Sequence, residues 1–403
     1  MPEAGARTEP ARPLKASRSL RVGCALLLVL GAAALARSAS GCLALDPVLV
    51  DHVRAGARLA ETWLLANQRD NGLLVYRYDP ARDHVSGRNN ALRQLMASRT
   101  LARIAARDPA ARPAHRRNLE FVLRHWYRVD DEGRGHVLYD DKSKLGANAV
   151  AIRALLASPD LAAHGQVLRQ LVDGVLSLQA SDGGFRAWLV EPDYAYDEDY
   201  LLTFYSGEAI LALHEYATRL GDDVVLAHAR RAIEHYRARY VDAIEQNFYP
   251  AYVPWHTFAL DAEHRLTADP RHADAVLIMN DRLLTLLDRQ VYRGRFHNPR
   301  FPAYGRPHVA SDGVYTESMV HAHAVAERVG DVARARAYRD ALDLALRHLV
   351  KLQYRDGGDF PHLPEHRLRG ALRTDVRDPA IRLDNVQHAL DAFEAALASA
   401  CEG

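Results

Sequence analysis

The sequence predicts an all-α protein of about twelve helices that pair into six hairpins. From Asp46 onward, apolar residues recur at the i, i+3, i+4 and i+7 positions of a helix, with Ala, Leu and Arg filling the segments. Clusters of Pro, Gly and Asp-Gly separate these segments, and no stretch shows the sustained alternation of a half-buried strand. Several helices also end in the same residue types, which indicates a repeated unit.

The first 45 residues are predicted to be an export signal with a linker. Residues 1–21 are polar and carry five basic side chains, and residues 22–36 form an uncharged apolar run that is short for a membrane span. Ala-Leu-Ala at 34–36 offers a cleavage site. Two alternatives are an uncleaved membrane anchor and a lipid anchor on Cys42, since residues 39–42 resemble a bacterial lipobox with Ala39 in place of the usual Leu. We therefore expect an exported protein, periplasmic or associated with the cell envelope.

The helices are expected within a single domain that spans residues 46–403. In chain order, the predicted segments are residues 48–68, 90–106, 114–128, 144–157, 164–180, 201–219, 222–241, 254–262, 270–291, 313–329, 331–353 and 381–400. Twelve segments correspond to six hairpins.

Three of the odd-numbered helices end alike. An apolar helix end is followed by Gln and then by Asp and Gly in residues 63–72, 178–185 and 352–358. The Gly residues suit the left-handed backbone that closes a helix. A supersecondary unit that recurs in this way implies a stacked or closed array of hairpins.

Gln-x-x-Asp-Gly-Gly at helix ends resembles the repeat of α/α toroids, and Trp63, Leu64 and Gln68 of the first copy are similar to the terpenoid-cyclase repeat. These toroids include terpenoid cyclases, protein prenyltransferases, and the six-hairpin glycosidases, lyases and sugar epimerases. The resemblance implies an (α/α)6 toroid over residues 46–400. It also implies that the even-numbered helices line the inside and that a site lies near their N-termini.

Composition narrows the functions. The net charge of +1 gives no overall field toward nucleic acid, so we expect no nucleic-acid partner. Cys24, Cys42 and Cys401 have no metal-ligand spacing, and no phosphate-binding Gly loop occurs, so we expect no metal and no cofactor. Cys24 lies in the apolar run, and whether Cys42 and Cys401 pair is left open. We expect a monomer.

The residues that open the even-numbered helices are rich in carboxylates, Tyr, His, Arg and amides, which suit sugars and proton transfer. The candidate catalytic residues are Glu208, Glu317, Asp384, Tyr205, Tyr315 and His256. The candidate substrate-binding residues are Asn90, Arg93, Lys144, Asn148, Trp255, His321, Asn385 and His388. A structural role remains open for each, because carboxylates cap helices and His or Tyr often pack in a core.

Two connections also stand out. Residues 193–200 are acidic and aromatic, and they are interpreted as a cation-binding loop or simply an exposed one. Residues 297–305 form a long connection rich in proline and aromatic residues before the fifth inner helix, which makes them a candidate substrate wall.

The leading prediction is an exported carbohydrate-active enzyme, of the glycoside hydrolase, lyase or uronate epimerase type, that acts on a polysaccharide. One alternative is a non-catalytic glycan-binding or scaffold protein of the envelope. Another is a terpenoid-cyclase-like protein, although no Asp-x-Asp-Asp motif occurs. A prenyltransferase or lanthionine cyclase would need a zinc-binding Cys in mid-chain, and none is present.

Overall fold

A computed structural model describes residues 41–355 and 360–401. Residues 43–403 form one compact unit. The predicted apolar run at 22–36, its cleavage site and the Asp-Gly-Gly end of the third repeat lie outside the described residues. No helix in the described part of the chain is long and apolar enough to cross a membrane.

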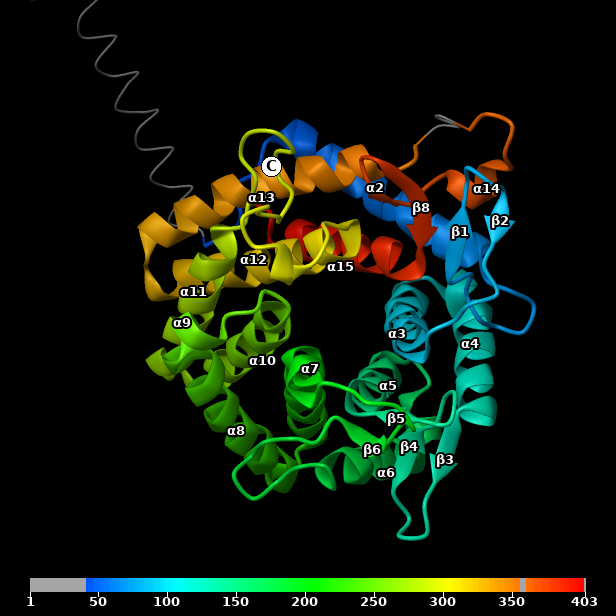
Figure 1. Ribbon diagram of the computed structural model, residues 1–403, viewed down its shortest axis with the longest axis vertical. Coiled ribbons are helices and arrows are strands. Elements are labelled where there is room, and N and C mark those ends of the chain that lie inside the picture. The colour runs from blue at the N-terminus through cyan, green and yellow to red at the C-terminus, as the bar shows by residue number, and fades with distance from the viewer. Residues whose placement is uncertain (1–40, 356–359, 402–403) are drawn as a thin grey trace, which may run out of the picture. The chain divides into compact units, whose positions relative to one another are not determined.

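Six helices form an inner ring (Figure 1). Each contacts the next along the chain, and the last returns to the first. They are α3 (Ala91–Arg107), α5 (Leu145–Ala157), α7 (Glu198–Leu220), α10 (Tyr252–Thr267), α12 (Val309–Val329) and α15 (Leu383–Ser399).

Six further helices form an outer ring. Each packs mainly against the inner helix that precedes it in the chain, and the first outer helix packs against the last inner one. They are α2 (Pro47–Ala66), α4 (Arg112–His125), α6 (Gly165–Leu176), α8 (Asp223–Arg237), α11 (Pro270–Leu284) and α13 (Val332–Leu352). The prediction of an (α/α)6 toroid is therefore confirmed for the described residues, with the even-numbered helices inside.

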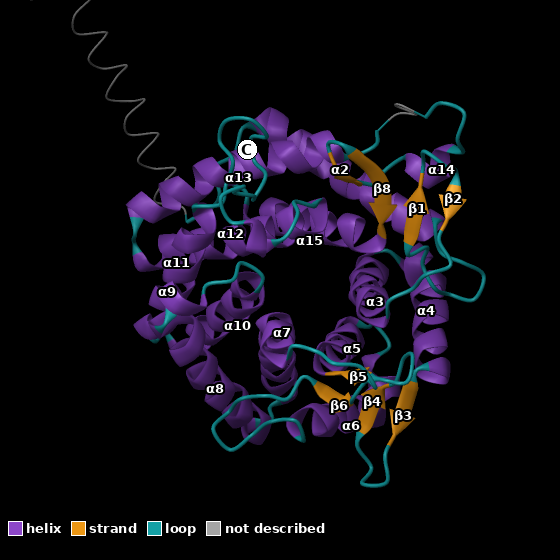
Figure 2. Ribbon diagram, in the orientation of Figure 1, coloured by secondary structure: helices purple, strands orange, loops and turns teal. Residues whose placement is uncertain are grey.

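Short strands lie in the connections between these helices (Figure 2). A four-stranded sheet has the order β2-β1-β8-β7, and two pairs join β3 with β4 and β5 with β6. The strands are β1 (Arg77–Asp79), β2 (His84–Val85), β3 (Tyr127–Val129), β4 (Gly135–Val137), β5 (Ser143–Lys144), β6 (Trp188–Val190), β7 (Arg373–Asp375) and β8 (Asp378–Arg382). At two to five residues each, they are too short to show an alternating pattern in the sequence. Strands β5 and β8 end where α5 and α15 begin, so they fix the backbone at the mouth of the ring.

Three inner helices differ from their predicted bounds by three residues or more. Helix α12 begins at Val309 rather than at 313, because His308 caps it by accepting a hydrogen bond from Ser311 N. Helix α7 begins three residues before the predicted 201, because the Asp197 side chain caps it by accepting a hydrogen bond from Tyr200 N at 3.0 Å. Helix α10 covers 252–267 rather than 254–262. In its second half, polar residues such as Asp261 and Glu263 are buried and form ion pairs inside the protein. They stand at positions where the helical pattern would have apolar residues, so the sequence does not show the full length of the helix. Helices α9 (Ile244–Asn247) and α14 (Glu365–Leu368) are single turns in connections.

The repeated Gln joins neighbouring outer helices. Gln68 Nε2 donates to Gly72 O at 2.9 Å in its own turn and to Ala114 O at 2.7 Å in α4. Gln179 makes the same pair of bonds, to Gly183 O and to His228 O in α8. The third copy, at Gln353, donates to the carbonyl of Gly56 in α2 and to that of Gly370.

The glycine of each turn allows this close approach. Gly72 has φ +93°, and a Cβ there would lie 2.2 Å from Arg117 O of α4. Gly183 has φ +97°, and its added Cβ would lie 2.5 Å from Arg231 O of α8. The turns with the Gln–Asp–Gly pattern therefore connect neighbouring helices of the outer ring.

A second set of contacts ties the start of an inner helix to the loop that precedes it. Asn148 Oδ1 accepts from Val137 N at 2.7 Å, and Glu198 Oε1 accepts from Ala187 N at 2.8 Å. The same kind of contact joins Gln94 to Leu74, Asp312 to Phe296 and Asn385 to Leu372. Five of the six inner helices are thus tied near their N-termini to the connection that precedes them.

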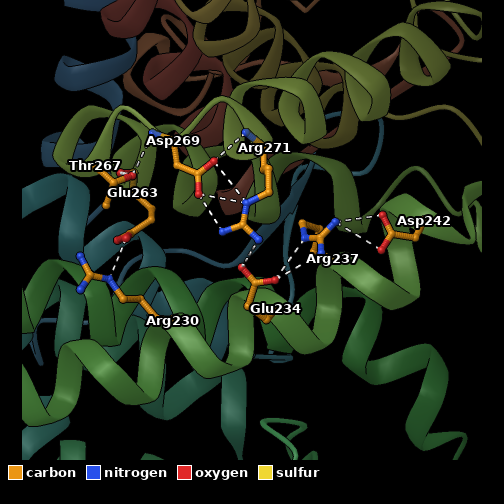
Figure 3. Close-up of polar contacts among 8 residues, drawn as sticks. All are labelled: Arg230, Glu234, Arg237, Asp242, Glu263, Thr267, Asp269 and Arg271. Carbon is orange, nitrogen blue, oxygen red and sulfur yellow. Dashed lines mark hydrogen bonds and ion pairs between the residues drawn. The ribbon is translucent and has the colours of Figure 1, made fainter.

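Ion pairs extend the outer ring at α8 and at the turn between α10 and α11 (Figure 3). Arg230 Nε lies 2.7 Å from Glu263 Oε1, and Arg271 reaches both Asp269, at 2.7 Å, and Glu234, at 3.7 Å. The pairs of Arg271 are exposed, and each contributes little, about 0–1 kcal/mol.

The ends of the compact unit meet in a short backbone contact. Leu43 N donates to Ser399 O at 2.7 Å, and Cys401 N donates to Leu43 O at 3.1 Å. Cys42 and Cys401, whose pairing the sequence leaves open, are both disulfide-bonded.

Candidate active site

A cavity of about 430 Å³ opens at the N-terminal ends of the inner helices. All six inner helices, or the residues just before them, line it. Nine of the predicted site residues lie on its wall, namely Asn90, Arg93, Lys144, Tyr205, Glu208, Trp255, Tyr315, Asp384 and His388. These residues come from segments up to 298 positions apart in the chain (Asn90 to His388), and the closed ring brings them together.

Glu208 forms part of the wall from α7. Its side chain is 1% exposed, and its Oε2 has no hydrogen-bond partner. Burial raises the pKa of Glu208 to about 8, against the opposing effects of Arg153, Arg93 and Lys144. Glu208 therefore keeps its proton at neutral pH. A buried carboxyl with these properties is a candidate proton donor.

Gly146 on α5 makes room for this carboxyl. A Cβ on Gly146 would lie 2.3 Å from Glu208 Oε2 and 2.5 Å from a ring carbon of Tyr205. Any larger residue at position 146 would therefore push the acid from its place.

Asp384 faces the cavity from the first turn of α15 and lies between two guanidinium groups. Arg93 Nε donates to Asp384 Oδ2 at 2.5 Å, and Arg382 Nε donates to Oδ1 at 3.0 Å. Burial alone would raise the pKa of Asp384, but Arg93 and Arg382 hold it well below its usual range. The cluster of Arg93, Asp384 and Arg382 therefore holds two cations and one anion, and its net charge is +1.

His388 lines the cavity from α15, one turn after Asp384. Burial lowers its pKa to about 4, so the imidazole is neutral at pH 7. Its Nδ1 is buried without a hydrogen-bond partner, and its ring lies 6.1 Å from that of Trp255. A neutral imidazole on the cavity wall is a candidate base.

Lys144 stands at the start of α5, at the end of strand β5. Its Nζ lies 5.5 Å from the ring of Trp188 on β6. Burial lowers the pKa of Lys144, and the neighbouring Lys142 and Arg93 act in the same direction. Lys144 also borders a smaller chamber of about 130 Å³ that adjoins the main cavity at Asn90 and Leu92.

Aromatic rings form one wall. Tyr249 lies edge-on to Tyr200 at 5.8 Å and to Tyr304 at 5.9 Å, and all three line the cavity. Tyr304 belongs to the connection 297–305, which was predicted as a substrate wall. Sugar rings stack on aromatic faces, so this wall suits a saccharide.

The acidic run 193–200 serves several local roles. Asp197 caps α7, Glu198 binds Ala187 N, and Asp199 pairs with Arg239 at 2.9 Å. Tyr194 lies under Lys142, with the ring centroid 5.5 Å from Nζ, and Tyr200 reaches the cavity. The carboxylates of residues 197–199 thus bind three different partners and do not form one cluster.

Five predicted site residues lie outside the main cavity. Glu317 lies beneath it with Arg99 and Asp391, where burial and the Asp391 charge raise the pKa of Glu317. Asn148 and Asn385 are buried and hold the preceding loops. His321 bonds Asp261 Oδ2 at 2.6 Å.

His256 is the fifth. It is buried on α10, and its Nε2 lies 3.0 Å from Ser206 Oγ. Its ring packs against Tyr236 and Tyr240, with centroids 5.6 and 5.2 Å away, and burial lowers its pKa to about 3. Although His256 is next to Trp255 in the chain, its side chain packs against neighbouring helices and does not line the cavity.

Several lining residues do not appear among the predicted candidates. His308 caps α12, with Ser311 N donating to its Nδ1 at 3.1 Å, and Arg306 precedes it in the connection. A His in the N-cap position before an apolar run was the available signal for His308. Arg382 opens the sixth inner helix two residues before its partner Asp384, but it is not among the predicted candidates. Gly146 gave no signal, because its role arises from Glu208 and Tyr205, which are distant in sequence.

No protein-family model matches the sequence, and no curated protein matches it. Solved structures do resemble it. The GH76A α-1,6-mannanase from Salegentibacter sp. superposes with a TM-score of 0.63 at 11% identity, covering 86% of this chain and 98% of the mannanase. Cellobiose 2-epimerase from Bacillus thermoamylovorans gives 0.62 at 12% identity, covering 87% and 100%.

An unsaturated glucuronyl hydrolase specific for heparin gives a TM-score of 0.59 at 8% identity, covering 86% of this chain and 97% of the hydrolase. These proteins are α/α toroids that process saccharides. At such low identities the likeness shows a shared fold alone.

Proposed function

We propose that this chain is a carbohydrate-active enzyme of the epimerase or lyase type, in which His388 removes a proton from carbon and Glu208 returns one. The supporting observation is that burial moves the pKa values of these two cavity residues in opposite directions, to about 4 and about 8. At pH 7 one group is an unprotonated base and the other a protonated acid. Groups paired in this way divide the work of acid–base catalysis.

The two residues stand on helices α7 and α15, which lie across the inner ring from each other (Figure 1). A sugar between them could lose a proton from carbon to His388 on one face. Glu208 could protonate the opposite face, which inverts the carbon, or protonate a departing glycosidic oxygen, which completes an elimination. Removal of the proton leaves an electron pair on the carbon. This pair must be delocalised onto the oxygen of an adjacent carbonyl or carboxylate group.

The charge of the cavity supports this class of reaction. The cluster of Arg93, Asp384 and Arg382 carries a net positive charge, and Lys144 adds another. Positive charge stabilises the negative charge that develops when a carbon loses its proton. The same charge opposes the cationic sugar of a glycosidase transition state.

Glycoside hydrolysis is the second candidate, favoured by one observation. Glu208 is protonated and Asp384 is ionised in the same cavity, which is the division of roles between two carboxyl groups that a glycosidase uses. The terpenoid-cyclase alternative fits less well, because the wall carries several charged side chains. A scaffold protein needs neither shifted carboxyl.

Exchange of hydrogen with solvent tests the proposal. Poly- and oligosaccharides are incubated with the protein in D₂O, and the products are followed by NMR. We expect deuterium on a sugar carbon, or an unsaturated sugar, and loss of both with Glu208→Gln or His388→Gln. His323→Gln is a matched control, because His323 is also buried with its pKa lowered to about 4 but lies outside the cavity. New reducing ends without deuterium on carbon would favour the hydrolase, and no change in any saccharide would favour the scaffold.

We also propose that the protein is exported and acts on envelope or extracellular glycan. The basic N-terminal segment with its apolar run supports export, and so do the disulfide-bonded Cys42 and Cys401, since disulfides persist in oxidising compartments. A disulfide at Cys42 excludes a lipid on the same sulfur, and mass spectrometry of the protein purified from its host distinguishes the two.

A further inference from the structure

Lysine is rare in this chain, and its placement is uneven. Of 52 basic residues, Lys occurs only at positions 15, 142, 144 and 351. Lys144 lines both the main cavity and the smaller chamber beside it, and Lys142 lines the chamber. Two of the three lysines within residues 41–403 therefore stand at one corner of the site.

Lys144 differs from Lys142 and Arg93, the cations beside it, in having no anionic partner. Lys142 Nζ lies 2.5 Å from Asp140 Oδ2, and Arg93 is bound to Asp384. Within residues 41–355 and 360–401, no carboxylate lies within 4 Å of Lys144 Nζ, and the ammonium lies 5.5 Å from the centroid of the Trp188 ring. An ammonium held half-buried without a counter-ion loses hydration that nothing in the protein replaces.

The balance of charge over the cavity points the same way. Lys144, Arg93 and Arg306 line it as cations, and Asp384 is the ionised anion, while Glu208 keeps its proton. The wall therefore carries two more positive than negative charges at pH 7. Lys144 also occupies the N-cap position of α5 without capping it, so the positive end of that helix adds to the field.

We propose that the saccharide bound here carries an anionic substituent, a carboxylate or a sulfate, that pairs with Lys144 where the main cavity meets the smaller chamber. This inference rests on the proposed function and names the class of its substrate. The anion replaces the missing counter-ion of Lys144 as a charge-assisted hydrogen bond. For a carboxylate next to the reacting carbon, the same pairing disperses the charge that proton removal creates.

Calorimetric titration of Glu208→Gln, which binds without turnover, tests this. The probes are glucuronate, galacturonate, mannuronate and glucose 6-sulfate, each against its neutral parent sugar. We expect at least one anionic sugar to bind about ten-fold or more tightly than its parent. Binding of a uronate but not of the sulfate ester identifies a carboxylate, and the reverse identifies a sulfate.

The role of Lys144 is tested in the same background. Lys144→Met should abolish the preference for the anionic sugar, and Lys144→Arg should retain it. Lys351→Met is the matched control, because it removes one charge from the outer helix α13 away from the cavity. The inference is overturned if no anionic sugar binds, if neutral sugars bind equally well, or if the preference survives Lys144→Met in a folded protein.

Failure of this inference can be told from failure of the proposed function. If the wild type and Lys144→Met process a neutral saccharide equally, the inference fails and the enzyme proposal stands. If anionic sugars bind through Lys144 but the wild type changes no saccharide, the inference stands and the enzyme proposal fails.

Discussion

Replacing Glu208 by Gln should make the protein more stable at neutral pH. In the folded protein the pKa of Glu208 is about 8, against 4.5 for the free side chain. Between these two pH values the unfolded chain has lost the proton and the folded chain keeps it. The unfolded state then binds fewer protons, so stability falls as pH rises, by about 1.4 kcal/mol for each pH unit.

The size of the effect follows from that slope. At pH 7, which lies 2.5 units above the unfolded pKa, the penalty is about 3 kcal/mol. It vanishes near pH 4, where both states are protonated, and it stops growing above about pH 8. Gln fills nearly the same volume and does not titrate, so Glu208→Gln removes the penalty.

Urea denaturation of both proteins between pH 4 and 8 measures this difference. The stability of Glu208→Gln should exceed that of the wild type by about 3 kcal/mol at pH 7 and by almost nothing at pH 4. Glu120→Gln, at an exposed position of α4, should show no such rise with pH. Equal stabilities of wild type and Glu208→Gln from pH 5 to 8 would refute the burial argument.

Two further substitutions test separate parts of the account. Gly146→Ala should cost about 1–3 kcal/mol in unfolding free energy, because its new methyl would overlap the Glu208 carboxyl and the buried ring of Tyr205, and it should lower kcat at least ten-fold by displacing that carboxyl. Gly165→Ala, where a Cβ meets nothing within 4 Å, is its control, and full activity of Gly146→Ala would contradict the positioning. Gln179→Ala removes two bonds to main-chain carbonyls and should cost about 2 kcal/mol in urea denaturation; a loss no larger than that of the exposed Gln166→Ala would show that the repeat does not stitch the ring.

The architecture was predictable from the sequence because it depends on local patterns. Helical periodicity gave all twelve long helices, and the recurring Gln at 68, 179 and 353 indicated a closed array. A fourth turn of the same kind pairs Leu287 with Phe296 and escaped notice, because Leu replaces Gln there. The short strands were missed since two to five residues carry no periodic signal.

The sequence predicted which helix ends form the site, but not which side chains point into the cavity. Glu208 and Glu317 both sit on inner helices, and sequence treats them alike. The structure places Glu208 on the cavity wall and Glu317 one layer deeper with Asp391. A rotation of 100° per residue and the tilt of each helix decide this, and neither can be obtained from spacing alone.

Long-range partners were equally out of reach. Asp384 was identified as a helix-opening carboxylate, but its pairing with Arg93 joins residues 291 positions apart. That pairing turns a candidate catalytic carboxylate into a fixed anion between two cations. His256 likewise opens an inner helix, yet it packs among tyrosines.

The most direct test of the central claim is an NMR titration of the Glu208 carboxyl carbon, assigned by comparison with Glu208→Gln. The acid–base account predicts a midpoint near pH 8, and so a protonated carboxyl at pH 7. A midpoint near pH 4.5 would show an ordinary ionised carboxylate and would contradict Glu208 as the proton donor of this cavity.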